Sequence, residues 1–273
     1  MRTARKLVSE ESVGLYHVLS RVVERRLVFG EAEKAHFRKL LLAYAEFSGI
    51  DVVAWCLMGN HFHLLLRVPV KSGRHQDDPP DAEVLRRVGL INGRAVRIHL
   101  ENLLAMCGAE SSRRELLAPY RRRMGDLGLM MKSLKQRFTQ WFNRNNERSG
   151  TLWEERYRSF IVDHEEDGTS QTPGVAAGYG EIARVVAAYI DANPVRAGLV
   201  SDPAEYRWSG FGEASSGSAA DLSALARLWG LPGQEALACQ RRMIIARGAE
   251  KVEPGALVAS FSSLGSQPPL KSL

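Results

Sequence analysis

The sequence has no long hydrophobic run and few cysteines. No apolar segment approaches the roughly 18 residues that cross a bilayer, and the first residues (MRTARKLVSEES) lack the apolar stretch of a secretory signal. We therefore expect a cytoplasmic protein that does not enter a membrane. The three cysteines, Cys56, Cys107 and Cys239, form no CxxC pair, which excludes a disulfide framework and a zinc knuckle and predicts reduced thiols.

Polar or low-complexity sequence also does not dominate the chain. The chain has 273 residues, of which 45% are hydrophobic and 25% are charged. This composition is typical of a globular protein with a core of its own and excludes a wholly disordered or collagen-like chain. The length suits one large domain with appendages.

The net charge of +6 is modest, but it is concentrated in one part of the chain. Between Arg113 and Arg158 there are 12 Lys or Arg residues and 5 Asp or Glu residues, a local excess of +7. Clustered cations of this kind bind polyanions by displacing counterions from phosphates. A charge run is as often an ordinary solvated helix face, so the charge alone leaves both interpretations open.

The first 70 residues predict a strand, a helix and a hairpin. Tyr16 to Val23 is strand-like, and apolar residues at helical spacing precede Gly49. The β-rich runs Val52–Met58 and His61–Val68 are separated only by Gly59 and Asn60, which predicts a hairpin. This order opens a split βαβ unit, so we expect an α+β, ferredoxin-like antiparallel sheet with helices packed on one face.

The rest of the chain divides into an insertion, the completion of the sheet and an extension. Residues of about 70–127 predict a helical insertion with two short helices, and a stronger helix follows. Gly150 to Val162 predicts a turn and a strand, Asp163 to Gly180 a loop, and Glu181 to Asn193 a helix that ends before Pro194. We expect residues 1–211 to form the main domain and residues 212–273 a partly helical C-terminal extension with a frayed end.

Two histidines in the second hairpin strand are the first candidates for chemistry. Alternation along the strand places His61 and His63 on one face, about 6.6–7 Å apart at the backbone. This spacing suits two ligands of one metal ion. Two half-exposed polar residues are the more common explanation of such a pair, and two imidazoles leave a coordination shell incomplete.

The late helix presents a phenol and an amide on one stripe. Tyr189 and Asn193 are i,i+4 neighbours on the side that carries Val185, Val186 and Ile190, which is the side expected to pack on the sheet. On spacing alone, a core aromatic residue and a helix-end asparagine are the more common explanation. The residue pattern alone leaves both alternatives open.

Four separated blocks of sequence resemble one protein family. The chain is similar to the REP-associated tyrosine transposases, which are related to the IS200/IS605 transposases and belong to the HUH single-strand endonucleases. The blocks that carry the resemblance are GNHFHLLLRVP (Gly59–Pro69), GTLWEERYRSFIV (Gly150–Val162), YIDANPVRAGLV (Tyr189–Val200) and EYRWSG (Glu205–Gly210). The resemblance implies that residues 1–211 are an IS200-like catalytic domain.

The resemblance also implies roles for the four candidate residues. His61 and His63 match the pair that holds a divalent metal, Asn193 matches a third ligand, and Tyr189 matches the nucleophile. We expect Mg²⁺ or Mn²⁺, cleavage of single-stranded DNA through a 5′-phosphotyrosine, and no nucleotide cofactor. The sequence departs from the family at Gly59, where a proline is common, and in its long insertion and long loop before the tyrosine helix.

The expected partner is single-stranded or hairpin DNA of the REP type, bound by a monomer or a homodimer. The predicted contacts are cationic side chains that track the backbone and aromatic rings that stack on bases. For Trp153, packing in the core is an equally good explanation. The residues predicted to contact DNA are Lys132, Lys135, Arg137, Arg144, Trp153, Arg156, Tyr157 and Arg158.

Two other functions are compatible with the same fold. The chain could be a catalytically silent regulator that binds DNA hairpins, although its intact His61, His63, Tyr189 and Asn193 argue against that. A metal-storing or RNA-binding ferredoxin-like module would instead carry stacking aromatic residues on the exposed face of the sheet, where this chain has histidines.

Overall fold

The computed structural model describes residues 12–70, 79–165 and 179–247. At its centre lies a four-stranded antiparallel sheet with the order β2-β3-β1-β4. The strands are β1 (Val13–Arg21), β2 (Asp51–Leu57), β3 (His61–Val68) and β4 (Arg158–Glu165). This is the order of a split βαβ sheet, and the predicted α+β class and hairpin are confirmed.

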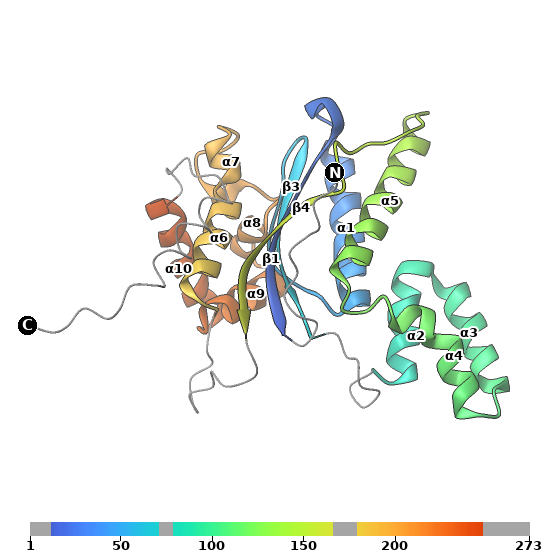
Figure 1. Cartoon of the computed structure of the whole chain (residues 1–273). Coiled ribbons are helices and arrows are strands. Elements are labelled where there is room, and N and C mark those ends of the chain that lie inside the picture. The colour runs from blue at the N-terminus through green and yellow to red at the C-terminus, as the bar shows by residue number, and fades with distance from the viewer. Residues whose placement is uncertain (1–11, 71–78, 166–178, 248–273) are drawn as a thin grey trace, which may run out of the picture.

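Two helices cover one face of this sheet (Figure 1). Helix α1 (Glu31–Ser48) connects β1 to β2, and its end at Gly49, which has a left-handed φ of 66°, follows the prediction. Helix α5 (Leu127–Asn145) precedes β4 and is capped by Asp126, whose carboxylate accepts from the backbone N–H of Leu129 at 2.8 Å. They are the two helices expected of a split βαβ unit.

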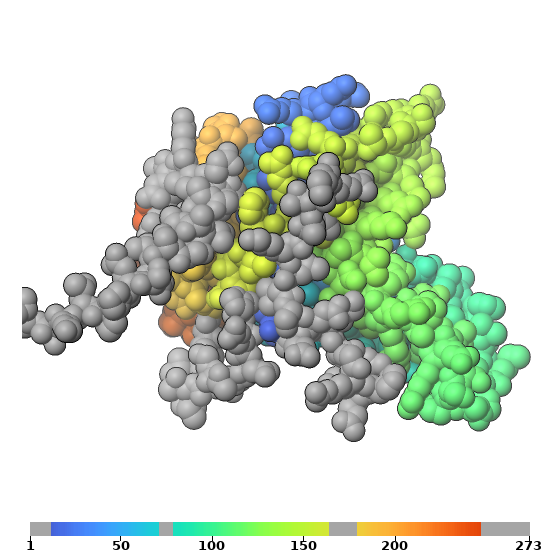
Figure 2. All heavy atoms as spheres, in the orientation of Figure 1, coloured from blue at the N-terminus to red at the C-terminus, as the bar shows by residue number. Residues whose placement is uncertain are grey.

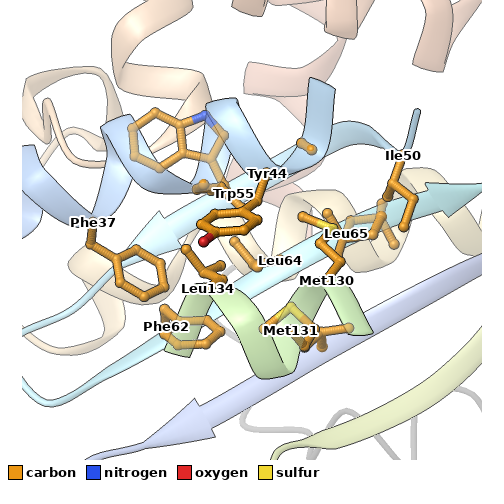
Figure 3. Packing of buried hydrophobic residues seen from close by; sticks show 14 of the residues in the cluster. Phe37, Tyr44, Ile50, Trp55, Phe62, Leu64, Leu65, Met130, Met131 and Leu134 are labelled. Atoms are coloured by element: carbon orange, nitrogen blue, oxygen red, sulfur yellow. The ribbon is translucent and has the colours of Figure 1, made fainter. Parts of the chain in front are cut away.

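The main core lies between these helices and β2 and β3 (Figure 3). Phe62 faces this layer, where its ring lies 4.7 Å from that of Phe37 on α1. Phe138 of α5 meets Phe37 edge to face at 5.2 Å. Even-numbered residues of β3 therefore point toward α1 and α5, and the odd-numbered histidines point to the other face.

Helices also cover that second face, an addition to the expected arrangement (Figure 1). Its side chains include Ala54, Cys56 and Leu65, which are apolar and need cover from water. Helix α6 crosses the sheet here, and α9 packs beside β2. The helices on this side are α6 (Glu181–Asp191), α7 (Asn193–Arg196), α8 (Gly210–Ser215), α9 (Ala219–Trp229) and α10 (Gly233–Arg247).

The insertion forms three helices where the sequence predicted two. They are α2 (Asp81–Asn92), α3 (Arg94–Met106) and α4 (Glu110–Arg121), and they build a lobe that projects beside the main body (Figure 2). Val84, Val88 and Leu117 are fully buried within it, and Asp81 pairs with arginines of α4. Helix α2 packs on α1, so the lobe is joined to the layer opposite the histidines.

Other predictions have mixed outcomes. Strand β4 continues to Glu165, three residues into the predicted loop, and two 3₁₀ turns occur at η1 (Val23–Arg25) and η2 (Pro203–Glu205). All three cysteines are free, as expected. No helix in the described ranges has the length and apolar character needed to cross a membrane. The remainder of the predicted loop and the predicted frayed end lie outside the described residues, and the proposed domain boundary stays a prediction.

Candidate active site

The hairpin strand β3 places His61 and His63 beneath the later helices. Their ring centroids are 5.1 Å apart, and the rings meet edge to face. His63 is buried at 4% exposure, whereas His61 is half-buried. On the neighbouring strand β1, Arg21 lies opposite His61 and Leu19 opposite His63. The two imidazoles therefore lie side by side at one end of the sheet, as the alternation predicts.

A third histidine, which the sequence analysis missed, completes this cluster. His17 on β1 is fully buried, and its Nε2 lies 3.0 Å from Nδ1 of His63. The two rings stack with centroids 5.3 Å apart. The pairing of β1 with β3 creates this contact between residues 46 positions apart, and nothing in the local strand pattern marks it. A polar residue in an otherwise apolar strand is the one signal that could have drawn attention to it.

Helix α6 brings Tyr189 to the same cluster. The ring of Tyr189 lies 5.9 Å from that of His63 and 6.1 Å from that of His17, and it meets both edge to face. The guanidinium of Arg196 on α7 lies over the other side of the phenol ring, 4.4 Å from its centroid. The helix and the hairpin are far apart in sequence, yet the structure brings the phenol and the imidazoles together.

Asn193 marks the junction between α6 and α7. Its amide nitrogen donates to the carbonyls of Tyr189 at 3.0 Å and Ile190 at 3.1 Å, in the last turn of α6. Helix α6 ends at Asp191, two residues before the predicted end, and α7 begins at Asn193 with Pro194 in its first turn. Because the amide nitrogen is held by the helix end, the Oδ1 atom is fixed in orientation as well.

The histidines are in the protonation state that metal ligation requires. Burial lowers the pKa of His61 to about 4, with a further contribution from Arg21. Burial, followed by the neighbouring His17 and His61, holds the pKa of His63 well below its usual value. The Nδ1 of His61 lies 2.6 Å from the Asn60 side-chain oxygen and donates to it, which leaves a lone pair on Nε2.

This donor set fits a divalent cation that keeps open positions. Two neutral imidazoles and the amide oxygen of Asn193 would supply three ligands, a number that suits a catalytic site better than a closed structural zinc site. No cluster of three or more His, Cys, Asp or Glu side chains suited to a metal occurs in the described part of the chain. The predicted set is not such a cluster, because its third member is an amide.

Two arginines give the site a positive potential. Arg21 and Arg196 both lower the pKa of His63, which shows that their charges reach the cluster. Neither forms an ion pair with a carboxylate among the described residues. Unpaired guanidinium groups beside neutral imidazoles and a phenol are suited to a phosphate, which they can bind with two parallel hydrogen bonds.

Three of the residues predicted to contact DNA are buried instead. The ammonium of Lys135 donates to Ser20 Oγ at 2.7 Å and to the carbonyl of Glu155 at 2.8 Å. Trp153 packs against Phe62 and donates its indole N–H to Thr139 at 2.9 Å. Tyr157 is 7% exposed. These side chains hold α5 to the sheet, so the core alternative weighed for Trp153 is the one the structure shows.

The other five predicted contacts are exposed but do not form one surface. Lys132, Arg137 and Arg144 lie on α5, across the sheet from Tyr189 (Figure 1). Arg156 and Arg158 lie at the start of β4. Arg158 is opposite Leu19, which is opposite His63, so its side chain shares the face of the histidines.

A strained turn beside the histidines presents further cations that the sequence analysis missed. Glu24 and Arg25 in η1 both have left-handed φ angles, 58° and 55°. The turn exposes Arg25, Arg26 and Leu27, the last at 84%. Asn60 holds the turn, because its amide donates to the carbonyl of Arg25 at 2.9 Å. Asn60 thus connects this basic turn, Glu24–Leu27, to His61.

Comparisons with known proteins agree with the resemblance drawn from the sequence. A family model described as "Transposase IS200 like" matches residues 12–75, a range that contains His17, His61 and His63. No curated protein sequence matches the chain. A solved structure of a REP-associated tyrosine transposase bound to a REP hairpin aligns with 80% of this chain and 87% of its own, at 13% identity and a TM-score of 0.42.

Proposed function

We propose that this chain, whose first sheet strands match the IS200-like transposase model, is a metal-dependent tyrosine endonuclease of the transposase type. It would cleave and rejoin single-stranded DNA next to a hairpin of the REP type, through a 5′-phosphotyrosine. The solved transposase with a similar chain was bound to such a hairpin, which is why we propose this substrate.

The observation that carries the proposal is the position of Tyr189. Its ring lies against His63 and His17, in contact with the face that also presents His61. A core aromatic residue has no need of buried imidazoles and an arginine around it. All of these groups come from one chain, which supports action by a monomer.

Each side chain has a defined task in the proposed reaction. When bound by His61, His63 and Asn193, Mg²⁺ or Mn²⁺ would act as a Lewis acid toward the scissile phosphate. The oxygen of Tyr189 attacks the phosphorus, and the bond from phosphorus to the 3′ oxygen breaks. The phenol proton is lost to solvent, and the departing 3′ oxygen takes up a proton. Arg21 and Arg196 stabilise the charge that develops on the phosphate.

Rejoining reverses these steps with another 3′ hydroxyl. Because the phosphotyrosine conserves the phosphodiester bond energy, no nucleotide cofactor is needed. Exposed cations near the site, namely Arg25, Arg26 and Arg158, would hold the backbone of the DNA that enters and leaves.

The test is formation of a covalent protein–DNA adduct. Protein is incubated with end-labelled single-stranded DNA containing a REP-like hairpin and Mn²⁺, and the products are separated under denaturing conditions. We expect an adduct with the wild type, none with Tyr189→Phe, and none when EDTA removes the metal. Tyr179→Phe is the matched control and should form the adduct normally.

The same assay separates the enzyme from the silent regulator. A regulator would bind the hairpin in a gel-shift assay and form no adduct with any divalent metal. An adduct that persists in Tyr189→Phe would show that another residue is the nucleophile.

A further inference from the structure

His17 is a buried titratable group that has no task in the proposed reaction, yet it lies in contact with a candidate metal ligand. Its ring is fully buried between β4 and α6, with Phe160 at 6.1 Å and Tyr189 at 6.1 Å between ring centroids. Its Nε2 is 3.0 Å from Nδ1 of His63, and the two rings are almost parallel, with an angle of 18°. This contact defines the orientation of the His63 ring.

The hydrogen bond between the two rings determines which nitrogen of His63 is available. Both rings are buried, and burial favours the neutral form of an imidazole. One ring must donate and the other accept. If His63 donates from Nδ1, its Nε2 carries a lone pair. If His17 donates from Nε2, the hydrogen of His63 lies on its own Nε2, which then binds no cation.

We infer that His17 is a positioning residue: its Nε2 accepts the Nδ1–H of His63 and leaves the Nε2 lone pair of His63 for the metal. This inference rests on the proposed function. His61 has the same arrangement, because its Nδ1 donates to the Asn60 oxygen at 2.6 Å. Each ligand thus has its inner nitrogen held by a neighbouring side chain, the usual way in which proteins orient a metal-binding imidazole.

The surroundings of His17 argue against a purely structural role. Its Nδ1 is buried and has no hydrogen-bond partner in the described part of the chain. The neighbours of His17 on the same face of β1, Leu15 and Leu19, are leucines, so an apolar side chain at position 17 would fit its surroundings, and its cost would be the loss of the partner of His63 Nδ1. The imidazole is therefore a cost to the fold that the contact with His63 explains.

Metal affinity measured on variants tests the inference. Co²⁺ is titrated into the full chain and followed by its visible absorption, and Mn²⁺ binding is measured by calorimetry. His17→Leu, which removes the acceptor, should weaken binding about 10- to 100-fold. His17→Gln, whose amide oxygen can accept, should stay within a few-fold of the wild type. His99→Leu, on the exposed side of α3, is the control and should bind normally.

Stability separates positioning from packing. His17→Leu removes one unpaired buried nitrogen, Nδ1 of His17, and leaves another, Nδ1 of His63, so the metal-free protein should melt close to the wild-type temperature. A lower melting temperature with unchanged Co²⁺ affinity would overturn the inference, and so would an equal loss of affinity in His17→Gln and His17→Leu.

A measurement on the wild type covers the case in which His17→Leu does not fold. Nitrogen NMR of the ¹⁵N-histidine protein in Mg²⁺ assigns the hydrogen of His63. We expect it on Nδ1, and a hydrogen on Nε2 would overturn the inference. If the wild type forms the DNA adduct but the measurements on His17 give an overturning result, only the inference is refuted. If the wild type neither binds Co²⁺ nor forms an adduct, the proposed function itself is refuted.

Discussion

Individual basic side chains in this protein divide according to burial. Lys135 is buried and donates to Ser20 and Glu155, whereas Arg196 lies at the surface with its guanidinium over the Tyr189 ring. Lys135 belongs to the basic stretch Arg113–Arg158 that suggested binding of a polyanion, and Arg196 lies outside that stretch. The structure assigns the first to the fold and leaves the second available to a phosphate.

Removing the Arg196 charge should slow the chemical step. We expect Arg196→Gln to form the adduct about 10- to 100-fold more slowly in single-turnover assays, because a hydrogen bond to a charged phosphate contributes about 1.5–3 kcal/mol. Hairpin affinity should change much less. Arg114→Gln on α4 is the matched control, and an unchanged rate in Arg196→Gln would remove this arginine from the proposed reaction.

The same substitution at Lys135 and at Lys132 should change the stability of the protein by different amounts. Lys135→Met leaves the buried Ser20 hydroxyl and the part-buried Glu155 carbonyl without this donor, so we expect the free energy of unfolding to fall by about 1–3 kcal/mol, measured with urea. Lys132→Met, on the exposed side of the same helix, should change it by less than about 0.5 kcal/mol. A stable Lys135→Met protein that binds the hairpin poorly would instead support a direct DNA contact.

Among the elements, α6 depends on α10 for its position. Asp191 of α6 is fully buried at 1% exposure, and burial raises its pKa to about 7. The Gln240 side chain of α10 donates to this carboxyl at 2.7 Å, and its oxygen accepts from the Trp229 indole at 3.0 Å. The network joins α6, α9 and α10.

Cutting this network should destabilise the protein. We expect Gln240→Leu to lower the free energy of unfolding by about 1–3 kcal/mol, because the buried carboxyl loses a donor. Gln234→Leu, on the exposed side of α10, should have little effect. Thermal denaturation followed by circular dichroism measures both, and equal melting temperatures for the two variants would contradict the assigned role of the network.

At the scale of the whole molecule, the sheet separates two groups of exposed cations. Lys132, Arg137 and Arg144 lie on the α5 side, whereas Arg158 and Arg196 lie with the histidines. The basic turn, Glu24–Leu27, lies at the end of β1 next to the hairpin. DNA that reaches Tyr189 would therefore meet this turn before it meets α5.

The salt dependence of binding tests this order. If Arg25 and Arg26 each contact a phosphate, the double variant Arg25→Gln/Arg26→Gln should reduce the slope of log affinity against log salt by about 1.4, since each contact to a single strand contributes about 0.7. Arg94→Gln/Arg114→Gln, in the lobe of α2, α3 and α4, should leave the slope unchanged. Fluorescence anisotropy with labelled single-stranded DNA gives both slopes.

The sequence predicted what is local and missed what depends on distant pairing. The hairpin, the end of α1 at Gly49 and the stripe of Tyr189 and Asn193 follow from spacing and turn residues. His17 and the buried state of Lys135 depend on contacts across 46 and 115 positions, which no local pattern contains. The second layer of helices was missed because period-two alternation does not reveal what covers the outer face.

The order of these groups along the chain has a consequence for synthesis. The histidines leave the ribosome early on β1 and β3, but Tyr189 follows only after α2 to α5 and β4, and its helix is then supported by α10. An incomplete product that stops before α6 would carry the imidazoles with no phenol to cut a strand. Under the proposed function, truncated forms of the protein would therefore be unable to form the phosphotyrosine.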